Sequence, residues 1–437
     1  MSIDPIRLSR RLAVSGRFTL ALVLLGGAAC ASADTLGFDR ALQLASERSR
    51  QVAADDAAAG AAREMAIAAG QLPDPVLKAG VVNLPIDGPD RFSLTRDFMT
   101  MRTIGVSQEL TRGAKRRARA ARFEREAEFA AASRNLALTN TQRDTAIAWL
   151  ERHYEERLRE LLVGQRDEAR LQVDAADAAY RGGRGSQADV FAARGAVEQM
   201  EDRIAQAERQ IATAKTMLAR WVGADPARQA LGAAPPIDAV GLEATDLEAR
   251  FAHHPEIRVM VKKEEAAAAE AEVARANKKS DWSVELMVSQ RGPAYSNMVS
   301  LNVAVPLQWD QPRRQDRELA AKLGGIEQMR AEREEATRVH VAEALAMYQE
   351  WQSDRERLGR YERSLMPLAQ ERTRAALAAY RGGSGALGAV LEARRGEIDT
   401  GIERLRLEME MARVWARLHY LNPVGHEATA ALRGEPK

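Results

Sequence analysis

The octapeptide Ala178-Ala-Tyr-Arg-Gly-Gly-Arg-Gly185 recurs two hundred positions later as Ala378-Ala-Tyr-Arg-Gly-Gly-Ser-Gly385. Each copy follows a long run that is rich in alanine and charged residues, a composition typical of long helices. Glycine readily adopts the left-handed backbone conformation that ends many helices. Each octapeptide is therefore predicted to form a turn at the far end of an antiparallel helical hairpin.

The two halves of the chain also match beyond the octapeptides. Val190 corresponds to Val390 at the same offset, and further matches occur on both sides. Self-similarity at a fixed offset indicates an internal repeat. We predict a signal peptide at 1–33, a first repeat at 34–236 with its tip at 181–185, and a second repeat at 237–437 with its tip at 381–385.

Each repeat contains a short region where the sequence period changes from that of a helix to that of a strand. Apolar and polar residues alternate over 282–289 and over 299–305, which predicts strands with one apolar face. These strands are expected to form a hairpin at 282–306, and a less regular copy at 76–110 is expected to form another. The predicted fold class is mainly α with a small β part.

The remaining segments carry helical patterns. Apolar residues three and four positions apart indicate coiled-coil packing in the long runs. Pro367 is expected to kink the second long run, because proline lacks a backbone N–H. The predicted helices are Phe38–Gly70, Ala114–Tyr180, Ser186–Trp221, Asp246–Ala276, Arg313–Tyr380 and Ala386–Tyr420.

The N-terminal segment predicts export from the cytoplasm. Arg7, Arg10, Arg11 and Arg17 precede an apolar run, and small residues follow it up to Ala33. This order is that of a secretory signal peptide. The apolar run is much shorter than the ~20 residues that a membrane-spanning helix needs.

Cys30 leaves an alternative open at the same place. It is the only cysteine of the chain, and it could accept a lipid after export. Gly27 stands where a lipidation signal usually has a larger aliphatic residue, so cleavage after Ala33 is the preferred interpretation.

Composition and motifs argue against several classes of function. The chain has 64 Lys and Arg against 62 Asp and Glu. It therefore lacks the excess of basic residues that is typical of a nucleic-acid-binding protein. Glycine-rich segments that match a dinucleotide-binding pattern follow predicted helices, whereas such a site needs a preceding strand. Neither the adjacent His253 and His254 nor the thioethers of Met99 and Met101 are predicted to form a metal site. No catalytic motif is present, so we expect neither a cofactor nor enzyme activity.

The four predicted strands are too few to close a membrane β-barrel within one chain. Membrane β-barrels begin at eight strands, and a lone hairpin is marginally stable in water. A symmetric oligomer would supply the missing strands, and three copies of this chain would contribute twelve. Trp282, Trp309, Phe92 and Phe98 lie near the predicted strand ends, where membrane barrels carry an aromatic girdle.

On these features, residues 34–422 resemble the TolC-type family of trimeric outer-membrane efflux channels. The resemblance rests on the doubled order of helix, hairpin, long helix, tip and return helix. It also rests on Asp189-Val-Phe191 and Ala389-Val-Leu391 after the tips, and on His254-Pro-Glu-Ile257, which is similar to a helix start of the family. Asn83-Leu-Pro and Phe98-Met-Thr-Met101 are similar to its heavy-metal-efflux branch.

The resemblance implies a homotrimeric transmembrane α/β barrel in contact with outer-membrane lipid and extending into the periplasm. It implies two protein partners, a periplasmic membrane-fusion adaptor and an inner-membrane RND-type pump. The channel would be a passive conduit for what the pump exports, which in that branch means heavy-metal cations.

The resemblance also implies roles for residues at the tips. Asp189 matches an acidic tip position of the family, Ala389 replaces the equivalent acid, and Glu392 occupies the next acidic position. Gly385 stands where the family has an arginine, so this chain departs from the family's closed-state latch there. Tip gating or adaptor docking is implied for Tyr180, Arg181, Gly183, Asp189, Tyr380, Arg381, Gly383 and Glu392.

Two other classes remain open from the sequence. A periplasmic adaptor would have one helical hairpin flanked by many strands. A structural coiled-coil protein would lack both the segments of period two and the signal peptide. The doubled hairpin and the four predicted strands favour the channel.

Overall fold

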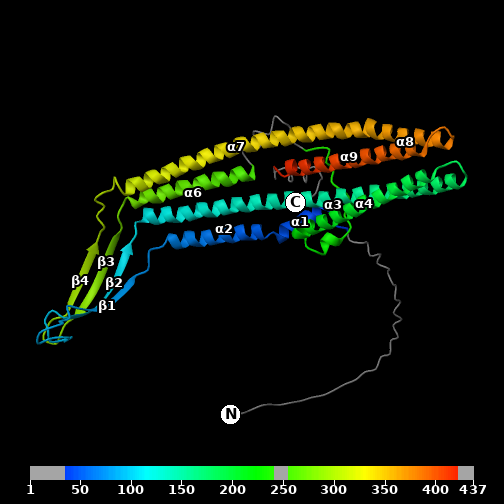
Figure 1. The fold of residues 1–437 in the computed structure, drawn as a ribbon. Helices are drawn as coiled ribbons and strands as arrows, with labels where there is room; N and C mark the ends of the chain where they lie inside the picture. The colour runs from blue at the N-terminus through cyan, green and yellow to red at the C-terminus, as the bar shows by residue number, and fades with distance from the viewer. Residues whose placement is uncertain (1–34, 241–253, 422–437) are drawn as a thin grey trace, which may run out of the picture. The chain divides into compact units, whose positions relative to one another are not determined.

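The computed structural model describes residues 35–240 and 254–421. The predicted signal peptide, Cys30, His253 and the segment 246–253 of a predicted helix lie outside these residues. The described part is mainly helical, and one antiparallel sheet lies at one end of the long helices (Figure 1).

The predicted elements are present with boundaries close to those expected. In chain order they are α1 (Phe38–Arg48), α2 (Arg50–Ala69), β1 (Val76–Val82), β2 (Met101–Leu110), α3 (Gly113–Arg181), α4 (Gln187–Val222), a short 3-10 turn (Pro226–Arg228), α6 (Pro255–Asn277), β3 (Trp282–Gln290), β4 (Met298–Ala304), α7 (Gln315–Arg360), a π-helical turn (Tyr361–Leu365), α8 (Met366–Arg381) and α9 (Leu387–His419).

The prediction of one opening helix over Phe38–Gly70 is wrong at a single residue. Ser49 has extended backbone angles, φ −62° and ψ 111°, and separates α1 from α2. Its hydroxyl accepts a hydrogen bond from the N–H of Val52 at 3.4 Å and lies 3.2 Å from the hydroxyl of Thr141. Serine offers the backbone an alternative to the helical bond, which is why it favours caps over helix interiors.

The second long helix is interrupted where Pro367 predicts a disturbance. A π-helical turn at Tyr361–Leu365 separates α7 from α8, and Pro367 lies in the first turn of α8. Proline removes one backbone donor and its ring clashes with the carbonyl four residues earlier. The wider π turn accommodates this local change in hydrogen bonding. The first long helix, α3, has no such interruption.

The four strands form one sheet in the order β1-β2-β3-β4. The central pair, β2 and β3, joins segments that are far apart in the chain, with Leu110 opposite Trp282. The register places Leu77, Val106, Leu286 and Leu301 in one row across all four strands. The alternation seen in each strand therefore becomes a continuous apolar face.

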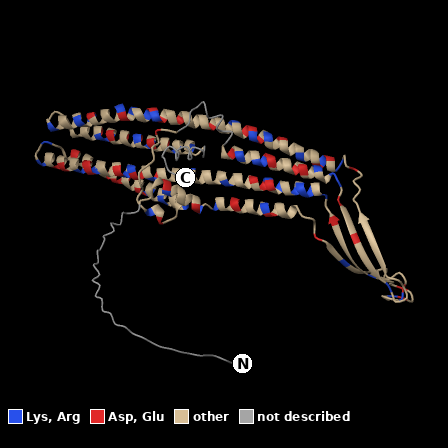
Figure 2. Ribbon diagram, turned by 180° about the vertical axis from the view of Figure 1, so that it is seen from behind, with Lys and Arg blue, Asp and Glu red and all other residues tan. Residues whose placement is uncertain are grey.

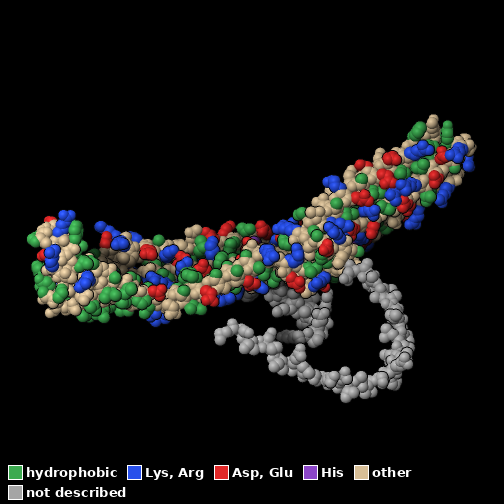
Figure 3. Space-filling view, turned by 90° about the horizontal axis from the view of Figure 1, so that it is seen from below, with side chains coloured by type: hydrophobic (Ala, Val, Ile, Leu, Met, Phe, Trp, Pro, Cys, Tyr) green, Lys and Arg blue, Asp and Glu red, His purple; other side chains and the backbone are tan. Residues whose placement is uncertain are grey.

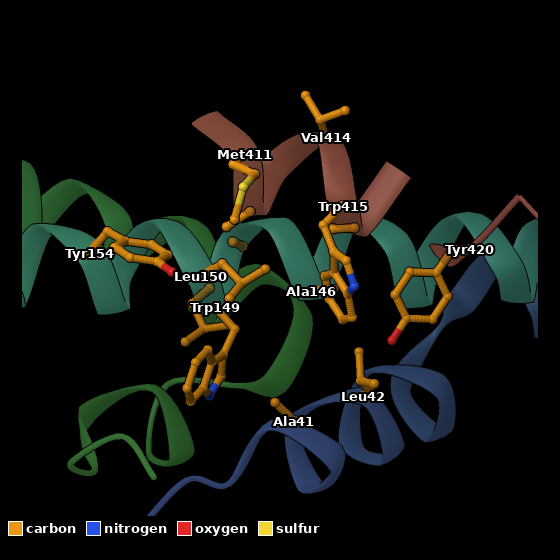
Figure 4. Close-up of a cluster of buried hydrophobic side chains, with 14 of the residues drawn as sticks. Ala41, Leu42, Ala146, Trp149, Leu150, Tyr154, Met411, Val414, Trp415 and Tyr420 are labelled. Atoms are coloured by element: carbon orange, nitrogen blue, oxygen red, sulfur yellow. The ribbon is translucent and has the colours of Figure 1, made fainter. Parts of the chain in front are cut away.

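The largest hydrophobic core lies where α1, α3, α4, α7 and α9 meet the loop segments near Leu36 and Ile237. Figure 4 shows its side chains from α1, α3 and α9. Three buried tryptophans hold these segments through their indole N–H groups. Trp149 donates to the Leu36 carbonyl at 3.1 Å, and Trp351 donates to the Ile237 carbonyl at 3.1 Å. Trp415 donates to the Ala239 carbonyl at 2.9 Å. The core thus fixes the helices midway between the sheet and the tips.

Candidate functional site

The two tips form the same backbone turn. The N–H of Gly182 donates to the Ala178 carbonyl at 3.0 Å, and Gly185 donates to the Ala179 carbonyl at 3.1 Å. The equivalent bonds two hundred positions later measure 2.9 and 3.0 Å. These bonds satisfy helix-end carbonyls that have no partner within the helix. The predicted turn is confirmed at both tips.

Glycine is required at two positions of each turn for two different reasons. Gly183 and Gly383 have φ of +69° and +75°, which residues with a side chain rarely adopt. A Cβ on Gly385 would lie 3.0 Å from the Cβ of Ala379, and Gly185 is almost as crowded. The glycines therefore act through backbone geometry.

The two tips pack against each other. Val190 of α4, Leu387 and Val390 of α9, and Ala176 of α3 form a small buried cluster. Tyr380 of α8 packs against the same cluster from its edge. A groove between the two turns is lined on one side by Gly183 to Ser186 and Asp189, and on the other by Tyr380 and Gly385 to Leu387. Of the predicted tip residues, Gly183, Asp189 and Tyr380 line this groove together. The other five do not line it: Tyr180, Arg181, Arg381, Gly383 and Glu392.

Asp189 lies in a capping box at the start of α4. Its carboxylate accepts hydrogen bonds from the N–H of Ser186 at 3.0 Å and from the Ser186 hydroxyl at 2.7 Å. The N–H of Asp189 in turn donates to the Ser186 Oγ at 3.1 Å. These bonds from Ser186 hold the pKa of Asp189 below its usual value. The carboxylate is therefore ionised at neutral pH and also serves the helix.

The second tip lacks this cap. Ala386 and Ala389 occupy the positions of Ser186 and Asp189, and α9 begins without a side-chain cap bond. Glu392, the candidate acid of this tip, is highly exposed and forms an ion pair of 3.0 Å with Arg372 of α8. The two candidate acids are thus on different helices and have different partners.

The Tyr-Arg pairs of the two tips also differ. Tyr180 is 46% exposed, whereas Tyr380 is partly buried against the tip cluster. Arg181 forms an ion pair with Asp177, while Arg381 has no ion pair among the described residues. Tyr380 therefore packs within the chain, and the Arg381 guanidinium is exposed.

The opposite end of the molecule carries the apolar sheet. Leu77, Val299 and Leu301 are each at least 67% exposed, so this face covers no core in the described chain. Figure 3 shows hydrophobic side chains gathered at this end, and Figure 2 shows that the strands carry few charges compared with the helices. The reverse face is more polar, and on it Lys78 forms an ion pair with Glu285 at 3.1 Å. Burying such an area requires another apolar medium.

The residues considered as metal ligands do not assemble. No group of three or more His, Cys, Asp or Glu side chains suited to a metal ion occurs among the described residues. His254 is buried and caps α6 by accepting the N–H of Glu256 at its Nδ1, 3.3 Å away. Met99 precedes β2 and Met101 begins it, so one strand does not hold both thioethers. No helix in the described ranges is long and apolar enough to cross a bilayer.

The capping role of Ser186 was missed from the sequence. The pattern Ser186-Gln-Ala-Asp189 is a capping box with Asp at the third position, and it directly precedes a helical run. Arg372 was also missed, because its pairing with Glu392 joins two helices across a turn. The first feature is local and could have been found, whereas the second is not.

Solved outer-membrane channels share this arrangement of sheet, helices and tips. The outer membrane protein VceC of Vibrio cholerae is 17% identical, covers 88% of this chain and 95% of its own, and has a TM-score of 0.73. The outer-membrane channel OprN is 15% identical, covers 88% and 89%, and has a TM-score of 0.72. The Campylobacter jejuni CmeC outer membrane channel is 12% identical, covers 88% and 85%, and has a TM-score of 0.68.

The chain has the fold of the TolC-type outer-membrane channels. The expected class, mainly helical with a small antiparallel sheet, is therefore confirmed, and the likeness of fold extends over nearly nine-tenths of the chain. No protein-family model and no curated protein sequence matches this chain. Within the TolC-type fold, the apolar sheet and the paired tips occupy opposite ends of the helices (Figure 1).

Proposed function

We propose that this protein is the outer-membrane channel of a tripartite efflux system and works as a homotrimer. The observation that carries the proposal is the exposed apolar face that spans all four strands. Joined to helices rich in charge, it suits a chain with one end in lipid and the other in the periplasm. The likeness of fold to outer-membrane channels supports the same assignment.

The proposed trimer follows from the edges of the sheet. Both β1 and β4 have a neighbour on only one side in the described chain. An unpaired strand edge cannot lie in lipid, because each free backbone polar group there costs several kcal/mol. Pairing β1 of one copy with β4 of the next removes every edge. Three copies give twelve strands, which is enough to enclose a water-filled lumen.

In this proposal the chain is made with a cleaved signal peptide at 1–33, and its two repeats contribute equivalent hairpins. The tips would project into the periplasm and meet a membrane-fusion adaptor that is bound to an RND-type inner-membrane pump. Asp189 and Glu392 would each occur three times around the closed end. A ring of carboxylates at a narrow opening favours the passage of cations.

For the exported substrate we propose heavy-metal cations, supplied by the pump. The resemblance of Asn83-Leu-Pro and Phe98-Met-Thr-Met101 to the heavy-metal-efflux branch of the family motivates this choice. A strain that lacks the gene should become more sensitive to copper or silver salts than to hydrophobic drugs. Equal sensitivity to drugs and metals would remove the metal assignment and leave the channel assignment in place.

The test of the channel itself combines mass with current. Detergent-purified protein should have the mass of three chains by native mass spectrometry, and it should conduct ions in planar bilayers. A variant that places two charges on the apolar face of β4, Leu301→Asp with Val303→Asp, should no longer insert into the bilayer. The control is Arg338→Gln with Arg374→Gln, which changes two exposed helical residues and should leave both mass and current unchanged. A monomeric, non-conducting protein would favour the alternatives, a periplasmic adaptor or a structural coiled-coil protein.

A further inference from the structure

The boundary between sheet and helices gathers an excess of positive charge. Three chain segments meet there, 109–119, 277–282 and 308–318, and they contain ten Lys or Arg against five Asp or Glu. Eight of these cations form no ion pair with any described residue, and two of the eight, Arg112 and Arg116, donate instead to backbone carbonyls. The other six form neither an ion pair nor a side-chain hydrogen bond within the described residues. We name these six the basic belt: Arg117, Arg119, Lys279, Arg313, Arg314 and Arg317.

The three segments are held together by contacts that use the remaining cations. Lys115 pairs with Asp281 at 2.6 Å, and Lys278 pairs with Asp316 at 2.7 Å. The guanidinium of Arg112 donates to the Ser280 carbonyl at 2.7 Å. These contacts hold together the start of α3, the segment that follows α6 and the start of α7, although the six belt cations form no ion pair or side-chain hydrogen bond of their own within the described residues. All of them except Arg119, which is half-buried, are exposed.

The start of α3 is an unfavourable place for cations. The N-terminal end of a helix carries a partial positive charge, which attracts anions and repels Lys and Arg. The first turn of α3 contains no acidic residue, and Arg112 before it provides no side-chain cap. Figure 2 marks Lys and Arg positions in blue on the ribbon at the helix ends next to the sheet. An external anion would relieve this repulsion.

The apolar face of the sheet leads directly into the belt. The alternation of β4 continues past its end through Val305 and Leu307 to Trp309, which is 87% exposed. Trp282, at the first position of β3, is 47% exposed at the same boundary. Exposed indoles between an apolar surface and a basic one are typical of the interface between lipid tails and headgroups. The exposed indoles and the basic belt therefore lie at the same boundary, between the sheet and the helices.

We infer that the basic belt binds the phosphates of anionic phospholipids in the leaflet that faces the helices. The inference rests on the proposed function, because it requires the sheet to lie in a membrane. Arginine and lysine near such a surface are attracted to anionic headgroups, each contributing about fivefold to binding. The belt thereby fixes the depth of the channel, with the sheet in the tails and the helices in water.

The test measures lipid retained by the purified full-length protein. Detergent-solubilised protein is mixed with phosphatidylglycerol, which is anionic, or with phosphatidylcholine, which is zwitterionic, and bound lipid is counted by native mass spectrometry. The protein should retain phosphatidylglycerol about tenfold better than phosphatidylcholine. Arg117→Gln with Arg313→Gln and Arg317→Gln should abolish this preference. The matched control, Arg50→Gln with Arg209→Gln and Arg363→Gln, removes three exposed cations elsewhere and should keep it.

Currents in phosphatidylcholine bilayers separate the inference from the proposed function. If the belt variant conducts but still prefers phosphatidylglycerol, the belt inference is wrong and the channel stands. If the belt variant loses its trimeric mass in both lipids alike, these cations face a second copy of the chain, which also overturns the inference. If the unaltered protein neither forms a trimer nor conducts, both the proposed channel function and the inference about lipid binding are wrong.

Discussion

The two helical hairpins share a tip sequence but differ in how firmly they are held. In the first, α3 runs without interruption from the sheet to the tip and has buried residues along most of its length. In the second, a π turn divides the helix, and Thr373 is the only buried residue of α8. Regions with few buried contacts open at lower free energy than the rest of a fold. Equal tips therefore do not imply equal mobility.

The caps reinforce this difference. The first return helix, α4, starts with the reciprocal bonds between Ser186 and Asp189. The second, α9, starts at Ala386 with no side-chain cap bond. We expect the second hairpin to open first, and each prediction below compares equivalent positions of the two halves.

The largest effect is expected at the tryptophans of the core. Trp149 is fully buried and meets the ring of Phe38 edge to face, with centroids 5.5 Å apart. Trp149→Ala should lower the free energy of unfolding by about 3–5 kcal/mol, since it leaves a large cavity and an unpaired carbonyl. Trp351→Ala, its counterpart, should cost less, because α7 is more exposed around it. The measurement is thermal unfolding in detergent, followed by circular dichroism. A larger loss of stability in Trp351→Ala than in Trp149→Ala would contradict the comparison.

The next effect depends on pH and separates the caps of α2 and α6. Burial, and then the nearby charge of His340, lower the pKa of His254 to about 4, with Glu256 opposing and Arg143 adding to the shift. The folded state therefore prefers neutral histidine, and stability falls as pH drops from about 6.5 towards 4. The loss should reach about 2 kcal/mol at pH 5. The cap of α2 is Ser49, which does not titrate.

His254→Ser tests this by giving α6 the cap of α2. Its melting temperature should change less between pH 7.5 and pH 5 than that of the unaltered protein. The comparison variant is His153→Gln in α3, which removes another histidine whose pKa burial lowers; by the same linkage it should also reduce the dependence of the melting temperature on pH. If the melting temperature of His254→Ser depends on pH as strongly as that of the unaltered protein, another group causes the acid sensitivity.

A smaller effect is expected from exchanging the tip caps. Ser186→Ala should destabilise the start of α4 by about 1 kcal/mol. Conversely, Ala386→Ser with Ala389→Asp should slow amide hydrogen exchange in the first turn of α9 about fivefold. Exchange rates that stay unequal between the two tips after both changes would mean that the π turn, and not the cap, sets their difference.

The smallest effect is expected at the candidate acidic rings. Asp189→Ala with Glu392→Ala should lower the preference for cations about twofold in planar bilayers, since it removes two charges per chain from the proposed opening. Glu392→Ala alone also frees Arg372, so Arg372→Gln is the matched control. Unchanged selectivity in the double variant would leave these acids with their local roles only, in the cap and the ion pair.

Local features were predictable and non-local ones were not. The strand boundaries of β2 and the two tip turns follow from patterns within a few residues. The break at Ser49 was not predicted, because helical residues surround it and its partner, Thr141, lies in another helix. Asp189 was predicted as a tip acid from the family resemblance, whereas its capping box with Ser186 was not predicted, although the pattern Ser186-Gln-Ala-Asp189 is local.

The sequence by itself determined the kinds of element and their order, because helix and strand periods and glycine turns depend on neighbouring residues. Only the tertiary structure decided that β2 pairs with β3, that the tips share one apolar cluster, and that three separate segments form the basic belt. Such pairings depend on which surfaces remain to be buried once the helices have formed, and that is a property of the whole chain.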